Sequence, residues 1–134
     1  MEERLIRVGI THGDINGIGY EVILKTFSDL RIADLCTPII YGSSKIAAYH
    51  RKALDLQPVN ISIISQAEEA GLNRINIINC ADEEAKVELG KSTTIAGEAA
   101  FKALEAAVND LKRGVIDVLV TAPINKHNIQ NDQF

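Results

Sequence analysis

Short apolar runs alternate with longer amphipathic segments along the chain. Strand-like runs occupy residues 5–10, 37–41, 61–64, 75–78 and 115–120. Helical periodicity occupies residues 18–27, 44–54 and 94–112, with single helical turns at 66–70 and within 121–134. This order of strands and helices predicts an α/β fold, a three-layer arrangement with helices on both faces of a sheet.

The apolar positions also predict which faces are buried. In the helix at 18–27, Ile18, Val22 and Ile23 are expected to face the core. The strand at 115–120 is mostly apolar, which is typical of a strand buried on both faces. The longest helix carries a stripe that is expected to pack on the sheet, made of Ala96, Ala100, Leu104, Ala107, Val108 and Leu111.

Composition excludes several classes of protein. The chain has 134 residues, 46% of them apolar, which predicts one folded domain. It has no run near the ~20 apolar residues that span a bilayer, and its N-terminus lacks a cationic signal pattern, so a cytoplasmic protein is expected. A net charge of −4 with scattered Lys and Arg argues against nucleic-acid binding. Cys36 and Cys80 are expected to be separate thiols, at least partly buried, rather than a disulfide.

A glycine-rich loop follows the first strand. In open α/β sheets, ligands bind beyond the carboxyl ends of the strands, where this loop is expected to lie. Gly13, Gly17 and Gly19 allow a tight turn and a close approach to a ligand, and the helix that follows favours an anion. Their spacing matches neither the dinucleotide-binding fingerprint nor the P-loop. A purely structural strand-to-helix turn therefore remains an equal alternative.

A second polar segment, residues 121–126, follows the last strand. Pro123 stiffens it, Asn125 offers a donor and an acceptor, and Lys126 offers a positive charge. A lysine beside a carbonyl or phosphate group can bind an anion or transfer a proton. An ordinary surface loop is the alternative interpretation.

The three histidines give no metal signature. His50 lies within a helix and is expected at its solvated surface. His12 and His127 would approach each other if the two polar segments share one edge of the sheet. Neither has a carboxylate or cysteine partner at ligand spacing, so no metal site is predicted in this chain.

Both polar segments resemble motifs of one family. Residues 11–21, Thr-His-Gly-Asp-Ile-Asn-Gly-Ile-Gly-Tyr-Glu, resemble the signature Thr-x-Gly-Asp-Pro-Ala-Gly-Ile-Gly-Pro-Glu of the 4-hydroxythreonine-4-phosphate dehydrogenases of vitamin B6 biosynthesis. The resemblance continues through Gly97 to residues 121–126, which resemble the family's Gly-Pro-x-His/Asn-Lys segment. Ile15-Asn16 and Tyr20 depart from the signature, and Asn125 stands where some members have His.

The resemblance implies a fold and an incomplete chain. The family is similar in fold to the isocitrate and isopropylmalate dehydrogenases, in which two α/β domains flank a cleft and subunits form homodimers. Residues 1–134 are then expected to be most of the N-terminal domain. The second domain, a Gly-His-Thr-Glu substrate-binding segment and the metal-binding histidines are expected beyond this chain, so the chain alone is expected to be inactive.

The resemblance also implies a reaction. The family oxidises 4-phosphooxy-L-threonine with NAD or NADP and decarboxylates the product to 3-amino-2-oxopropyl phosphate, on the route to pyridoxal phosphate. A divalent metal (Zn, Mg or Co), bound by residues outside this chain, assists both steps. The alternatives are a non-catalytic domain that binds a phosphorylated ligand, and a related metal-dependent hydroxy-acid dehydrogenase with a different substrate.

The implied site residues lie in the two polar segments. Lys126 is expected to bind an anion or transfer a proton, and Asn125 to orient the substrate. The remaining candidates are expected to shape the wall of the cleft and contact substrate or cofactor; they are Thr11, Gly13, Asp14, Gly17, Gly19 and Glu21.

Overall fold

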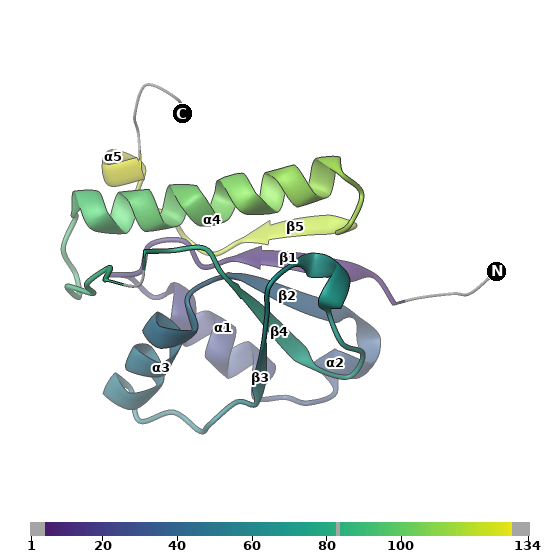
Figure 1. Ribbon diagram of the computed structural model, residues 1–134. Helices are drawn as coiled ribbons and strands as arrows, with labels where there is room; N and C mark the ends of the chain where they lie inside the picture. The colour runs from purple at the N-terminus through teal and green to yellow at the C-terminus, as the bar shows by residue number, and fades with distance from the viewer. Residues whose placement is uncertain (1–4, 83, 130–134) are drawn as a thin grey trace.

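A five-stranded parallel sheet forms the centre of the computed structural model, which describes residues 5–82 and 84–129 (Figure 1). The strands are β1 (Arg7–Thr11), β2 (Thr37–Gly42), β3 (Ile61–Ile64), β4 (Ile75–Asn79) and β5 (Val118–Thr121). The helices are α1 (Gly19–Phe27), α2 (Ile32–Leu35), α3 (Ser44–Ala53), the 3-10 turn η1 (Ala67–Glu69), α4 (Thr94–Lys112) and α5 (Lys126–Ile129). The strand order is β3-β4-β2-β1-β5, and every pairing is parallel.

Helices cover both faces of this sheet. In Figure 1, α4 lies on one side of the strands, and α1 and α3 lie on the other. Alternate side chains of β2 face the two layers: Ile40 packs in the cluster with α1 and α3, whereas Ile39 and Tyr41 pack in the cluster with α4. The predicted three-layer α/β arrangement is therefore confirmed.

The direction of each crossover explains which helix lies on which face. The connections from β1 to β2 and from β2 to β3 run one way across the sheet and carry α1 and α3. The connection from β4 to β5 runs back across β2 and β1, and it carries α4 on the opposite face. Because crossovers between parallel strands are right-handed, reversing the direction of travel moves the connecting helix to the other face.

The predicted burial of the last strand is wrong. The strand begins at Val118 rather than Val115, and Val118 and Val120 are 44% and 52% exposed. The cause is position: β5 is an edge strand with β1 as its neighbour, and α4 covers one of its faces. An apolar sequence alone does not distinguish an edge strand from a central strand of a sheet.

The buried faces of the helices also differ in part from the prediction. Ile18, which precedes α1 as its N-cap, and Val22 within α1 are 59% and 48% exposed, whereas Tyr20 and Ile23 are buried. On α4, the buried stripe consists of small residues, and Leu111 is exposed. Small residues let α4 lie close to the sheet. None of the described helices is both long and apolar enough to cross a bilayer.

Candidate functional site

The two polar segments lie against each other at the carboxyl ends of β1 and β5. The backbone N–H of Asp14 donates to the Pro123 carbonyl at 2.9 Å, and the N–H of Ala122 donates to the Thr11 carbonyl at 3.1 Å. Because β1 and β5 are parallel neighbours, both segments leave the sheet at the same edge. We call residues 12–19 and 122–126 together the strand-end site.

Two glycines allow this close contact. Gly13 has φ +66°, and a Cβ atom there would lie 2.8 Å from the Ala122 carbonyl oxygen and also overlap the Pro123 carbonyl. A Cβ atom on Gly19 would overlap the His12 carbonyl oxygen. The structural interpretation of these glycines is therefore supported directly. Their contact with a ligand stays a prediction.

Asp14 organises the turn itself. Its Oδ1 accepts a hydrogen bond from the Asn16 N–H at 3.0 Å, and its carbonyl accepts from the Gly17 N–H at 3.0 Å. This short-range bonding is the usual reason for Asp at the start of a tight turn. The carboxylate is half-buried, so it lies at the boundary between the turn and solvent.

The buried side chain of His12 holds the loop in place through hydrogen bonds. The Nε2 of His12 lies 3.0 Å from the Ala99 carbonyl, and its Nδ1 lies 2.8 Å from the Tyr20 hydroxyl. A carbonyl oxygen only accepts, so Nε2–H donates to Ala99, and Nδ1 accepts from the Tyr20 O–H. The Tyr20 oxygen in turn accepts from the Ser43 N–H at 2.8 Å. These bonds join the loop to α4, α1 and the end of β2.

The environment keeps His12 uncharged. Burial lowers the pKa of His12 from 6.5 to about 4, and the nearby His50 adds to this effect, while the bond to Ala99 opposes it. Burial likewise raises the pKa of the Tyr20 hydroxyl far above its ordinary range. Both groups therefore act at neutral pH as fixed hydrogen-bonding partners.

The prediction for His50 is wrong. It is buried rather than solvated, and its Nε2–H donates to the Ile15 carbonyl at 2.7 Å. Its ring stacks on Tyr20 with a centroid distance of 5.5 Å. A partner 35 residues away in sequence supplies this contact, and a periodicity argument confined to the helix cannot reveal it.

Asn16 ties the loop to residues 88–93. Its Oδ1 accepts from the Glu88 N–H at 2.7 Å, and its side-chain NH₂ donates to the Lys91 carbonyl at 3.0 Å. Its backbone carbonyl accepts from the Gly90 N–H at 2.9 Å. Asn16 departs from the family signature, and this departure is the sequence feature that indicates its role.

The second segment presents Asn125 and Lys126. Oδ1 of Asn125 accepts from the N–H groups of His127 and Asn128, at 3.0 and 3.4 Å, and so caps α5. Lys126 and His127 are exposed. His12 has both ring nitrogens occupied in the interior, so the structure does not present it with His127 as an accessible pair.

The other two candidates lie at the margins of the site. Thr11 is buried at the end of β1. Glu21 lies in the first turn of α1, where its carboxylate pairs with Lys25 at 2.7 Å. Across the described residues, no group of three or more His, Cys, Asp or Glu side chains could hold a metal ion.

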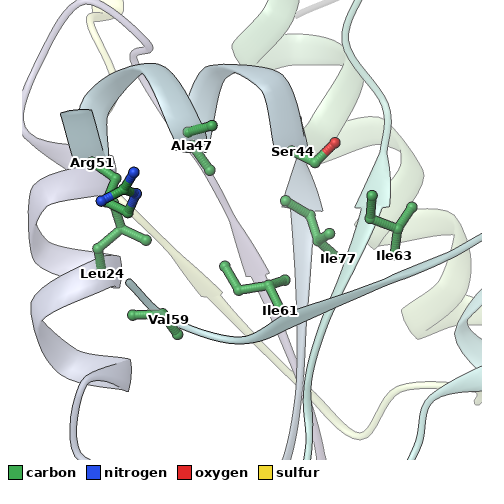
Figure 2. Close-up of a pocket in the computed structure, with 9 residues that line it drawn as sticks. Leu24, Ser44, Ala47, Arg51, Val59, Ile61, Ile63 and Ile77 are labelled. Carbon is green, nitrogen blue, oxygen red and sulfur yellow. The ribbon is translucent and has the colours of Figure 1, made fainter. Parts of the chain in front are cut away.

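A hollow of about 180 Å³ lies elsewhere, between α3 and the outer strand β3. Figure 2 shows the side chains that line it, among them Leu24, Ala47 and Ile61, converging from α1, α3 and the sheet. The Arg51 guanidinium at its rim donates to the Leu56 carbonyl at 3.4 Å. The lining is mainly aliphatic, with Ser44 and Arg51 as its polar members.

Comparisons with known proteins agree on one family. The family model described as pyridoxal phosphate biosynthetic protein PdxA matches residues 34–134. The 4-hydroxythreonine-4-phosphate dehydrogenase of Bacteroides thetaiotaomicron is 63% identical over 134 residues, which are 100% of this chain and 36% of that protein. A Clostridium botulinum protein, named provisionally as a D-threonate 4-phosphate dehydrogenase, is 31% identical over 128 residues, covering 92% of this chain and 37% of that protein.

A solved structure gives the same result for the fold. The crystal structure of a 4-hydroxythreonine-4-phosphate dehydrogenase from Burkholderia phymatum superposes with a TM-score of 0.82 at 29% identity. The match covers 95% of this chain and 39% of that one. This similarity confirms the expected resemblance to the isocitrate and isopropylmalate dehydrogenase fold. The chain spans little more than a third of the length of these relatives.

Proposed function

Because this chain belongs to the PdxA family of pyridoxal phosphate biosynthetic proteins, we propose that it is the N-terminal domain of a longer 4-hydroxythreonine-4-phosphate dehydrogenase. The observation that carries the proposal is the 63% identity, over the whole chain, to the Bacteroides thetaiotaomicron protein of that name. The strand-end site supports it, because both polar motifs of the family resemblance lie together at one edge of the sheet.

The proposed reaction has two steps. The secondary alcohol of 4-phosphooxy-L-threonine loses a hydride to NAD or NADP and a proton to a base. The resulting β-keto acid then loses carbon dioxide and gains a proton to become 3-amino-2-oxopropyl phosphate.

We propose that residues outside this chain bind the divalent metal. The described residues contain no group of three or more His, Cys, Asp or Glu side chains able to hold a metal ion. We therefore assign the ligands of the metal to the longer polypeptide.

Within this chain, the strand-end site supplies one wall of the proposed cleft. Lys126 is exposed, and we assign its ammonium to binding a substrate anion or moving a proton. Asn125 uses its Oδ1 to cap α5, so its side-chain NH₂ is the group we assign to substrate. The turn at Asp14 and the adjoining glycines shape the wall, while Thr11 and Glu21 bound it.

The remaining features of the proposal come from the family resemblance. We propose a homodimer in the cytoplasm that acts on a small phosphorylated amino acid and binds neither nucleic acid nor membrane. The second candidate function is a related dehydrogenase with another substrate, which the name of the Clostridium botulinum relative favours.

Kinetics of the whole polypeptide test the function. We expect NAD- or NADP-linked turnover of 4-phosphooxy-L-threonine with a higher kcat/KM than turnover of D-threonate 4-phosphate. The opposite preference would support the second candidate. Absence of turnover with both would favour a non-catalytic binding domain.

Replacement of one lysine tests the site. Lys126→Ala should lower kcat or raise KM at least about tenfold, a change of about 1.4 kcal/mol. Lys112→Ala, at the far end of α4, is the matched control and should leave both constants unchanged. Unchanged kinetics in Lys126→Ala would remove this residue from the site.

A further inference from the structure

An apolar groove of about 310 Å³ runs between α1 and the edge strand β5. Val22 and Ile23 of α1 line one side, and Val120 lines the other. Two more apolar side chains are exposed on these segments: Val118 on β5 at 44%, and Ile18 immediately before α1 at 59%. Among the described residues that line this α1–β5 groove, none is charged.

The groove exists because only one face of β5 is covered by a helix. Val120 pairs with Ile10, so both point toward the layer of α1. Leu119 points the other way and packs in the cluster beneath α4. Parallel sheets are normally covered on both faces, so a layer is missing over β5 on the α1 side.

The handedness of the crossovers restricts what can fill this gap. A strand added beyond β5 by a right-handed crossover would place its connecting helix on the α4 side. The short helix α5, which follows β5 directly, indeed lies against α4 (Figure 1). That direct connection therefore does not supply the missing layer.

We propose that an amphipathic helix from the part of the polypeptide that follows residue 134 fills the α1–β5 groove. This inference rests on the proposal that the chain is one domain of a longer protein. The solved relative has ample chain for such a helix, since the match covers 39% of its length. An uncharged lining fits the apolar face of a helix, and an apolar edge left bare would favour aggregation.

Thiol labelling of the whole polypeptide tests the proposal. Val120→Cys and Leu72→Cys are matched, because Val120 is 52% exposed and Leu72 62% exposed in this chain. Peptide mass spectrometry would follow alkylation by iodoacetamide at each position under native conditions. We expect labelling at position 120 to be at least about tenfold slower than at position 72, because a covered thiol reacts only after local opening. Val118→Cys is the second variant, should Val120→Cys not fold.

The labelling result distinguishes four outcomes. Protection that persists on dilution supports a helix of the same polypeptide. Equal labelling at positions 120 and 72 overturns the proposal, and so does protection lost on dilution, which would assign the groove to a second copy. Protection at position 120 without dehydrogenase activity would leave this inference standing and reject the proposed function.

Discussion

At the scale of single residues, the family signature has proline at two positions of the glycine-rich loop where this chain has Ile15 and Tyr20. Buried hydrogen bonds hold the loop at both positions instead. Tyr20 occupies one of these positions, and its hydroxyl joins His12 to Ser43. At the other, Ile15 is buried and its carbonyl receives the bond from His50. Proline restricts a turn through its ring, whereas this chain restricts it through partners on three helices.

The buried His12 ring predicts a loss of stability in acid. Above pH 6.5 the ring is neutral in the folded and unfolded states and favours neither. As the pH falls from 6.5 toward about 4, the unfolded ring binds a proton and the folded ring does not, because its pKa is about 4. The free energy of unfolding should therefore decrease by about 3 kcal/mol over this range.

Urea denaturation at about pH 7 and at about pH 5 measures this contribution. The free energy of unfolding should be about 2 kcal/mol lower at the lower pH because of His12. His12→Gln should lose less stability than the native chain between the two conditions. His127→Gln, which alters an exposed ring, should lose as much as the native chain. An identical loss in the native chain and in His12→Gln would show that His12 does not carry the effect.

The sequence indicated the loop but not its support. Glycines that a tight turn requires are visible in the sequence, so residues 11–17 are predicted as a loop between the first strand and the helix at 18–27. The bonds from Asn16 to residues 88–93 and from His50 to Ile15 join segments far apart in the chain. Local spacing does not reveal such distant partners, so the expectation of a solvated His50 is wrong.

At the scale of elements, the close contact between α4 and α5 holds the second polar segment in place. A Cβ atom on Gly97 would overlap the Asn128 carbonyl of α5. Ile129, the last residue of α5, is buried, so the short helix is anchored at both of these points. The position of Asn125 and Lys126 therefore depends on a glycine almost thirty residues earlier.

Gly97→Ala should destabilise the chain by about 1 to 3 kcal/mol, because the added methyl group forces α5 away from α4. The sign is informative, since the same change in a helix without such a contact stabilises it by about 1 kcal/mol. Urea denaturation gives the stability, and hydrogen exchange of residues 126–129 reports the release of α5.

Glu98→Ala, at the adjacent exposed position of α4, is the control and should change stability by less than about 0.5 kcal/mol. A more stable Gly97→Ala variant would mean that α5 does not need this approach.

At the scale of the whole molecule, the order of strands and helices was predictable and the lateral arrangement was not. Periodicity identified the strands and the main helices because each repeats over several residues. The place of β5 at the edge follows from where α4 returns across the sheet, a property of the assembled layers. The exposed Val118 and Val120 are the consequence.

The isolated chain should show no NAD- or NADP-linked turnover of 4-phosphooxy-L-threonine. We propose that it supplies only one wall of the cleft, and its described residues lack a cluster of metal-ligating side chains. A spectrophotometric assay of reduced cofactor, with the whole polypeptide as positive control, measures this. Metal-dependent turnover by the purified chain would contradict it.

The neighbours of β1 also bear on how the chain folds. β1 lies between β2 and β5 in the sheet. β2 follows β1 in the sequence after one helical crossover, whereas β5 is far away in the sequence. The Arg7 N–H of β1, for example, donates to the carboxylate of Asp117, just before β5 and 110 residues later. Closing a long loop costs more conformational entropy and slows pairing. The sheet should therefore nucleate around β1 and β2 and complete itself at β5. A nascent chain would carry an open, apolar β1 edge until almost all of these residues had been synthesised.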